Sequence, residues 1–363
     1  MPLAVLAKKM GVSEKKLELW EKGEQKPTFR QAQNFASKTH IPFGYLYLEE
    51  PPPLELPLPD LRTVGSEARK KPSPELLSLV STIGLRQEWY RDYLLDNDSV
   101  GRFKPREFGL HSSVEEVVAD MRKGLCINEG SFRGSWEEYY KLLIDRSEEA
   151  GILVMRQANL GSYKRKLLVS EFRGFALYDP VAPVIFVNQS DSPNARLFTL
   201  VHELAHIWIG ASGVSDAKPD SHRREEALCN AIAGEFLVPA AEILDFWRRD
   251  EDLQTNLIRL KARFPVSDWV IVRRAQTLKL ISLTEYQDYV DAEGKLYRER
   301  AKKSGGGNYY ATKKTQISPR FARTLVREAM SGRVLLREAS ALLNVRPYNI
   351  VKLSKELENR VST

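Results

Sequence analysis

The sequence is poor in the features that build disulfide frameworks and membrane spans. Its 363 residues include only two cysteines, Cys126 and Cys229, which argues against a disulfide-stapled secreted fold. No run of 18 or more apolar residues occurs, so we expect no membrane-spanning helix. The apolar stretch in the N-terminal MPLAVLAKKMGVS is too short for a secretory signal. We therefore expect a cytoplasmic protein with no membrane partner.

Histidine is also scarce, with five in the chain, whereas 42% of the residues are hydrophobic and 28% are charged. This composition is that of an ordinary globular protein, and the length suffices for two or three domains. The formal net charge is +7, and residues 295–363 hold 16 Lys and Arg against 5 Asp and Glu. Such a local surplus is typical of a solvated helical surface or of a surface that binds DNA or an acidic protein.

Four segments are expected along the chain. Residues 1–50 have the pattern of a small helical unit, and the proline-rich residues 51–72 predict a stiff, extended linker. Residues 73–245 predict the main core. Residues 246–363 predict a basic, helical C-terminal extension that is interrupted at Gly305–Gly307.

The pattern within the core changes from helical to extended and back. Serine residues followed by helical spacing predict three helices, and short β-rich runs bounded by Gly or Pro then predict three strands. From Pro193 onward the pattern is helical to the end of the chain. The fold class is therefore predicted as α+β, mostly helical, with a small three-stranded sheet. The helices are expected near Ser73–Leu95, Ser113–Leu125 and Ser135–Ala150, and the strands near Gly151–Met155, Phe175–Tyr178 and Val184–Asn188.

The segment RLFTLVHELAHIWIG at residues 196–210 carries the most informative motif. His202 and His206 are four residues apart, so on a helix both imidazoles project from one face and can bind one metal ion. Glu203 lies beside that ion and suits the role of general base. The motif H-E-x-x-H therefore predicts a zinc-dependent hydrolase, although two His and a carboxylate also tolerate manganese.

A catalytic zinc needs a third protein ligand, which the downstream run SHRREEALCNAIAGEFLVP offers. Spacing alone leaves His222, Glu225 and Glu226 open. A further donor is needed for the tetrahedral oxyanion of peptide hydrolysis, and Tyr178 and His222 are the candidates.

The runs 174–188, 196–210 and 226–239 together resemble the ImmA/IrrE family of zinc metallopeptidases. In that family a Glu that lies four residues before an Asn completes the zinc site, and these two residues match Glu226 and Asn230. The resemblance implies an endopeptidase core with a small sheet beside the active-site helix. It also implies a protein substrate, namely a repressor of the Xre class or an antitoxin.

The block LAKKMGVSEKKLELWEKGEQKPT resembles the helix-turn-helix of the Xre (Cro-like) repressors. Gly11 marks the tight turn, and Trp20–Gly23 with Pro27 match the ending W-E-x-G-x-x-x-P of that class. The first helix is shortened relative to the family. Lys15 and Lys16, near the start of the second helix, are the residues expected to contact DNA. A retained fold used for protein contact is the alternative.

Two hypotheses about function follow. The first is a regulatory zinc endopeptidase that uses Glu203 as general base. The second is a non-catalytic DNA-binding or antitoxin-like regulator with a structural or vestigial zinc site. The intact Glu203 favours the first, because a structural zinc site does not require that carboxylate.

Overall fold

A computed structural model describes most of the chain. The expected linker at residues 51–72, except Pro72, lies outside the described residues, as do Gly305–Gly307 and His222. The described ranges are 3–39, 43–48, 50, 72–99, 108–127, 132, 134–161, 165–215, 224–301 and 316–358.

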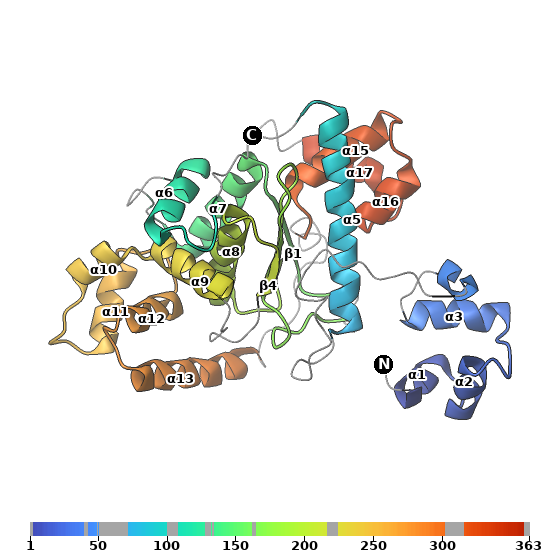
Figure 1. Ribbon diagram of the computed structural model, residues 1–363, viewed down its shortest axis with the longest axis horizontal. Coiled ribbons are helices and arrows are strands. Elements are labelled where there is room, and N and C mark those ends of the chain that lie inside the picture. Colours follow the sequence, from blue (N-terminus) through green and yellow to red (C-terminus); the bar gives the residue numbers. More distant parts are fainter. Residues whose placement is uncertain are drawn as a thin grey trace.

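The N-terminal residues form a small helical unit with a hydrophobic cluster of its own. It comprises α1 (Leu3–Met10), α2 (Glu14–Glu21), α3 (Phe29–Thr39) and the 3-10 helix η1 (Phe43–Tyr47), drawn in blue in Figure 1. Gly11 has a φ of 68°, a left-handed conformation that glycine adopts without strain, and it turns the chain between α1 and α2. The buried side chains of this cluster are Leu6, Ala7, Met10 and Leu17.

A four-stranded sheet lies at the centre of the rest of the molecule. Its strands are β1 (Leu153–Gln157), β2 (Gly174–Leu177), β3 (Val184–Asn188) and β4 (Gly213–Ser215), in the spatial order β1-β3-β2-β4. β1 and β3 are parallel, whereas β2 is antiparallel to both β3 and β4. The three expected strands are confirmed. The expectation of helix alone after Pro193 is wrong, since β4 is a strand of three residues, too short to show an alternating pattern.

Side chains of the sheet alternate between two hydrophobic cores, as the period of two in a strand requires. On β3, Ile185 and Val187 belong to one core, whereas Val184 and Phe186 belong to the other. Helices therefore cover both faces of the sheet (Figure 1). This explains why all five residues of β3 are buried.

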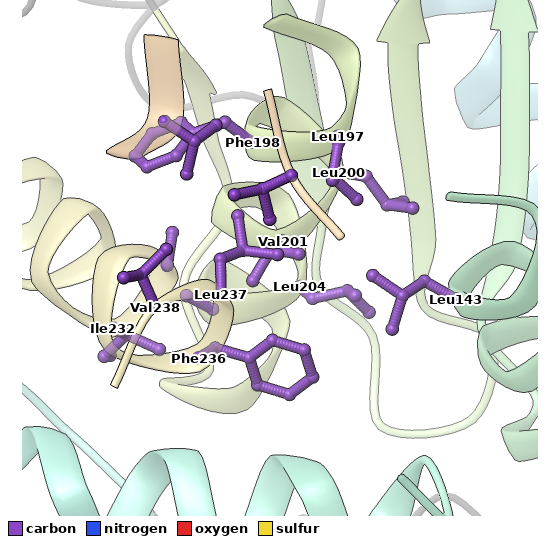
Figure 2. Packing of buried hydrophobic residues seen from close by; sticks show 14 of the residues in the cluster. Leu143, Leu197, Phe198, Leu200, Val201, Leu204, Ile232, Phe236, Leu237 and Val238 are labelled. Carbon is purple, nitrogen blue, oxygen red and sulfur yellow. The ribbon is translucent and has the colours of Figure 1, made fainter. Parts of the chain in front are cut away.

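One face is covered by α6 (Val114–Gly124), α7 (Trp136–Ala150), α8 (Pro193–Trp208) and α9 (Arg224–Leu237). The first three start at serine N-caps, whose hydroxyls accept a backbone N–H from the first turn. In Figure 2 the apolar side chains of α8 lie beside those of α9 and Leu143 of α7. The other labelled residues are Leu197, Phe198, Leu200, Val201 and Leu204 of α8, Ile232, Phe236 and Leu237 of α9, and Val238, which directly follows α9.

This core continues past residue 245. It includes buried residues of α10 (Ala240–Phe246), α11 (Leu253–Lys261) and α12 (Asp268–Thr277), with α13 (Leu283–Ala301) packed at its edge. α12 contacts both α8 and α9. These helices consequently help to hold α8 and α9 in place.

The other face of the sheet is covered by α5 (Pro74–Asp96) and by three C-terminal helices. These are α15 (Pro319–Met330), α16 (Leu336–Leu343) and α17 (Tyr348–Glu358) (Figure 1). Phe321 of α15 is fully buried in this core. Helix α5, which precedes the strands in the sequence, and the C-terminal helices α15 to α17 are thus brought together on one side of the sheet.

Among the described helices, none is by itself long and apolar enough to cross a membrane. The bent pair α9 and α10, with an angle of 54° between them, meets the requirement on length and composition alone.

Candidate metal centre

Helix α8 packs mostly apolar side chains into the core, and its motif lies among them. Ser192 caps its first turn and Pro193 follows at the first helical positions, where a missing N–H costs nothing. His202, Glu203 and His206 are almost completely buried, with 4%, 0% and 1% of their surfaces exposed. Burying three ionisable groups is expensive unless they pair or bind a cation, which makes this part of the helix a candidate site.

α9 brings Glu226 to the two histidines. The Nε2 atoms of His202 and His206 lie 3.2 Å apart. The Oε2 atom of Glu226 lies 3.2 Å from Nε2 of His202, and its Oε1 atom lies 3.2 Å from Nε2 of His206. Three buried donor atoms from two helices therefore converge on one point.

The spacing of these atoms fits a tetrahedral metal ion. With metal–donor bonds of about 2.0–2.1 Å and tetrahedral angles, two donors on one zinc ion lie about 3.3 Å apart. The separation of the two imidazole Nε2 atoms matches this value, and each of them lies at a similar distance from one oxygen of Glu226. The group of His202, His206 and Glu226 can hold a divalent cation, and three protein ligands leave one position open for water.

The fold shifts the protonation of the three groups in different directions. Burial acts to raise the pKa of Glu226, but hydrogen bonds from both imidazoles outweigh it and lower the pKa far below the usual range. Burial lowers the pKa of His202. Burial also opposes the charge on His206, yet the neighbouring Glu226 and Glu203 outweigh it and raise that pKa, so a cation that binds His206 must displace its proton. Glu226 is thus ionised at neutral pH, which is the form that binds a cation.

The carboxylate of Glu203 lies between α8 and the start of β2. A Cβ atom built on Gly174 would come within 2.7 Å of Glu203 Oε1 and 2.8 Å of a methyl carbon of Thr199. Only a glycine therefore leaves room for this carboxylate beside the strand. Sequence reasoning did not single out Gly174, because nothing local marks it as the neighbour of a residue 29 positions later.

An aromatic and cationic wall adjoins the metal centre. The ring of Phe198, one turn before His202, lies 6.3 Å from the imidazole of His202 and packs edge-on against Trp269 of α12. The guanidinium of Arg273 lies 4.6 Å from the centre of the Phe198 ring and donates a hydrogen bond of 3.0 Å to Asn230 Oδ1. Asn230, one turn after Glu226, thereby links α9 to α12.

Cys229 lies directly behind the site, fully buried and close enough to His206 to influence its charge. Burial raises the pKa of the Cys229 thiol, which stays neutral at physiological pH. The sequence interpretation used Cys229 only to argue against disulfides.

The other predicted site residues are Tyr178, Lys15 and Lys16, together with His222, which lies outside the described residues. Tyr178 follows β2, its backbone N–H donates to Ser212 Oγ, and its ring faces Gly210 just beyond the end of α8. Its proposed role as an oxyanion donor stays a prediction, as does that of His222. Lys15 is exposed on α2, and the ammonium of Lys16 lies 5.8 Å from the centre of the Trp20 ring.

Comparison with known protein families identifies the segment that carries this geometry. Residues 148–276 match the model Peptidase_M78, an IrrE N-terminal-like domain. Residues 317–356 match a model that is described as a domain of unknown function, DUF8813. A search of curated proteins finds no match to the chain.

The first match supports the ImmA/IrrE family for the part of the chain from β1 to α12, which includes His202, Glu203, His206 and Glu226. It indicates a metallopeptidase-type regulator. The second match covers α15, α16 and most of α17, on the opposite face of the sheet. The N-terminal helical unit lies outside both matched segments.

Proposed function

We propose that this protein is a zinc-dependent endopeptidase that acts in gene regulation, with an Xre-type repressor or an antitoxin as its substrate. The observation that supports it best is the convergence of His202, His206 and Glu226 with the buried carboxylate of Glu203 beside them. The family match over residues 148–276 supports peptide hydrolysis, and the resemblance to the ImmA/IrrE family supports the substrate class.

Each residue has a defined task in this proposal. His202, His206 and Glu226 hold the zinc ion, which when bound lowers the pKa of a coordinated water and polarises the scissile carbonyl. Glu203 accepts the proton of the attacking water and donates it to the leaving amine. Burial of Glu203 strengthens this role, since charges act more strongly where water is excluded.

The apolar packing around α8 supports the same proposal. Leu200, Val201 and Leu204 are fully buried and leave the motif little freedom to shift (Figure 2). Fixed donor groups are what catalysis requires, because a misplacement of about 1 Å can cost about 100-fold in rate. A structural zinc site would need the ligands to be fixed but not Glu203.

The test compares metal content with cleavage in matched variants. Purified protein is assayed for bound zinc and incubated with the Xre-type repressor encoded beside its gene. We expect Glu203→Gln to keep one zinc per chain and to cleave about 10²–10⁴-fold more slowly. Glu226→Gln should lose zinc, whereas Glu225→Gln, one residue away on α9, should keep both zinc and activity.

The outcomes separate the two hypotheses about function. Cleavage by Glu203→Gln at the wild-type rate would remove Glu203 from the mechanism. Stoichiometric zinc without cleavage of any repressor or antitoxin offered would instead support a non-catalytic regulator.

We further propose that residues 1–50 bind DNA through α2. Support comes from the turn at Gly11 between α1 and α2 and from the exposed Lys15 on α2. Deletion of residues 1–50 should abolish an electrophoretic shift of operator DNA, and the shift of the full chain should weaken steeply with salt. A shift that survives the deletion would point to another part of the chain.

A further inference from the structure

A cavity lies between α5, α15 and α17, on the opposite face of the sheet from the candidate metal centre. Its volume is about 590 Å³, which is within the usual range for small-molecule sites. Figure 1 shows α5 beside the three C-terminal helices that include α15 and α17. The segment that contributes α15 and α17 matches only a domain of unknown function.

The cavity carries a concentrated positive charge. Arg320, Arg323 and Arg327 of α15 all line it, and their spacing of three and four residues places them on one face of the helix. Among the described residues that line the cavity, none is Asp or Glu. This is part of the basic surplus that the sequence shows after residue 295.

Two of the arginines are held in position by tyrosines of α5. Arg320 Nε donates a hydrogen bond of 2.8 Å to the hydroxyl of Tyr90, and Arg327 donates to the hydroxyl of Tyr93. The ring of Tyr93 is also stacked at 9° on that of Trp89. These contacts form a wall of guanidinium groups and aromatic rings.

The nearby carboxylates only partly offset this charge. Glu328 pairs with Arg327 and Arg333, and buried Glu148 accepts the backbone N–H of Arg320. Arg323 is exposed at the mouth of the cavity, and no carboxylate within the described part of the chain pairs with it. The charge of Arg323 is consequently directed at solvent or at a ligand.

Hydroxyl groups complete the lining. Besides Tyr90 and Tyr93, the hydroxyl-bearing residues Ser99, Thr324 and Ser354 line the cavity. A carboxylate has one charge and two oxygens, which a single bidentate arginine satisfies. A phosphate has up to two charges and three terminal oxygens, and clustered guanidinium and hydroxyl donors match it better.

We propose that this cavity binds a phosphate ester of nucleotide size, with Arg320, Arg323 and Arg327 on the phosphate. A free nucleotide and one nucleotide of a single strand share this chemistry. This site is separate from the metal centre and does not depend on peptidase activity.

The test measures binding to the full-length protein. Inorganic phosphate, a nucleoside monophosphate, a nucleoside triphosphate, a six-nucleotide single strand and a glutamate-rich peptide are titrated by calorimetry. We expect saturable binding of the nucleotides, with Arg323→Glu at least 10-fold weaker and Arg323→Gln intermediate. Arg337→Glu makes the same charge change on exposed α16, outside the cavity, and should bind like wild type.

The comparison among probes identifies the source of the phosphate. Tighter binding of the triphosphate than of the strand indicates a free nucleotide, and the reverse indicates nucleic acid; either result supports the proposal if Arg323→Glu weakens it. The absence of saturable binding by every phosphate probe would overturn the proposal. Equal weakening by Arg323→Glu and Arg337→Glu, or tighter binding of the glutamate-rich peptide, would overturn it as well.

Discussion

The carboxylate of Glu203 occupies the space that a side chain on Gly174 would need. A Cβ at Gly174 would lie 2.7 Å from Glu203 Oε1 and 2.8 Å from the backbone oxygen of Phe186. The second contact is with a strand that cannot easily move. The sheet therefore sets the position of the proposed general base.

Gly174→Ala is expected to lower peptidase activity by about 10-fold or more while zinc content stays at the wild-type level. The added methyl group must displace Glu203 or β2, and overpacking of this kind costs about 1–3 kcal/mol. Turnover, bound zinc and melting temperature are measured together. Gly44→Ala, where a Cβ would meet nothing within 4 Å, is the control. Full activity in Gly174→Ala would show that Glu203 tolerates displacement.

Removal of the metal is expected to lower the melting temperature. A ligand that binds only the folded state stabilises it by about 4 kcal/mol at 1,000 times its dissociation constant. Thermal melts are recorded with a chelator and with added zinc. The difference in melting temperature between the two conditions should vanish in Glu226→Gln and persist in Glu225→Gln. Identical melts of the wild type in both conditions would contradict a metal site at this position.

Glu148 is expected to make stability fall as the pH rises towards neutrality. Burial raises its pKa from 4.5 to about 7, even though its carboxylate accepts hydrogen bonds from Val154 N, Ser318 Oγ and Arg320 N. Between these values the folded state binds more protons than the unfolded state. The contribution of Glu148 to the free energy of unfolding is therefore complete below pH 4.5 and is lost as the pH passes about 7. This loss amounts to about 3 kcal/mol at most.

Denaturant unfolding at pH 5 and pH 8 measures this effect. Glu148→Gln should lack the part of the pH dependence that Glu148 supplies, whereas Glu149→Gln, its exposed neighbour, should retain it. A pH dependence that is the same in wild type and Glu148→Gln would place the titrating group elsewhere.

Leu204→Ala is expected to destabilise the fold by about 2–5 kcal/mol. Leu204 is fully buried between α8 and the core helices (Figure 2), so its loss leaves a cavity. Leu244→Ala, at a position that is 51% exposed, should change stability by less than about 0.5 kcal/mol. Equal effects in urea unfolding would mean that the packing around α8 differs from that described.

The local elements could be predicted from the sequence because their causes are local. The caps Ser73, Ser113 and Ser135 each precede the first residue of a helix, where the expected helices begin. The strand β4 could not be predicted, since three residues carry no periodic signal and its pairing with β2 is a tertiary contact.

The sequence by itself determined that His202 and His206 share one face of a helix with Glu203 beside them, because a spacing of four residues is a property of the helix. Spacing left His222, Glu225 and Glu226 open as the third ligand, and resemblance alone selected Glu226. Tertiary structure decided what spacing could not: α9 crosses α8 so that Glu226 faces both histidines. Gly174 beside Glu203, and Tyr90 beside Arg320, are likewise contacts between segments that only the packed fold brings together.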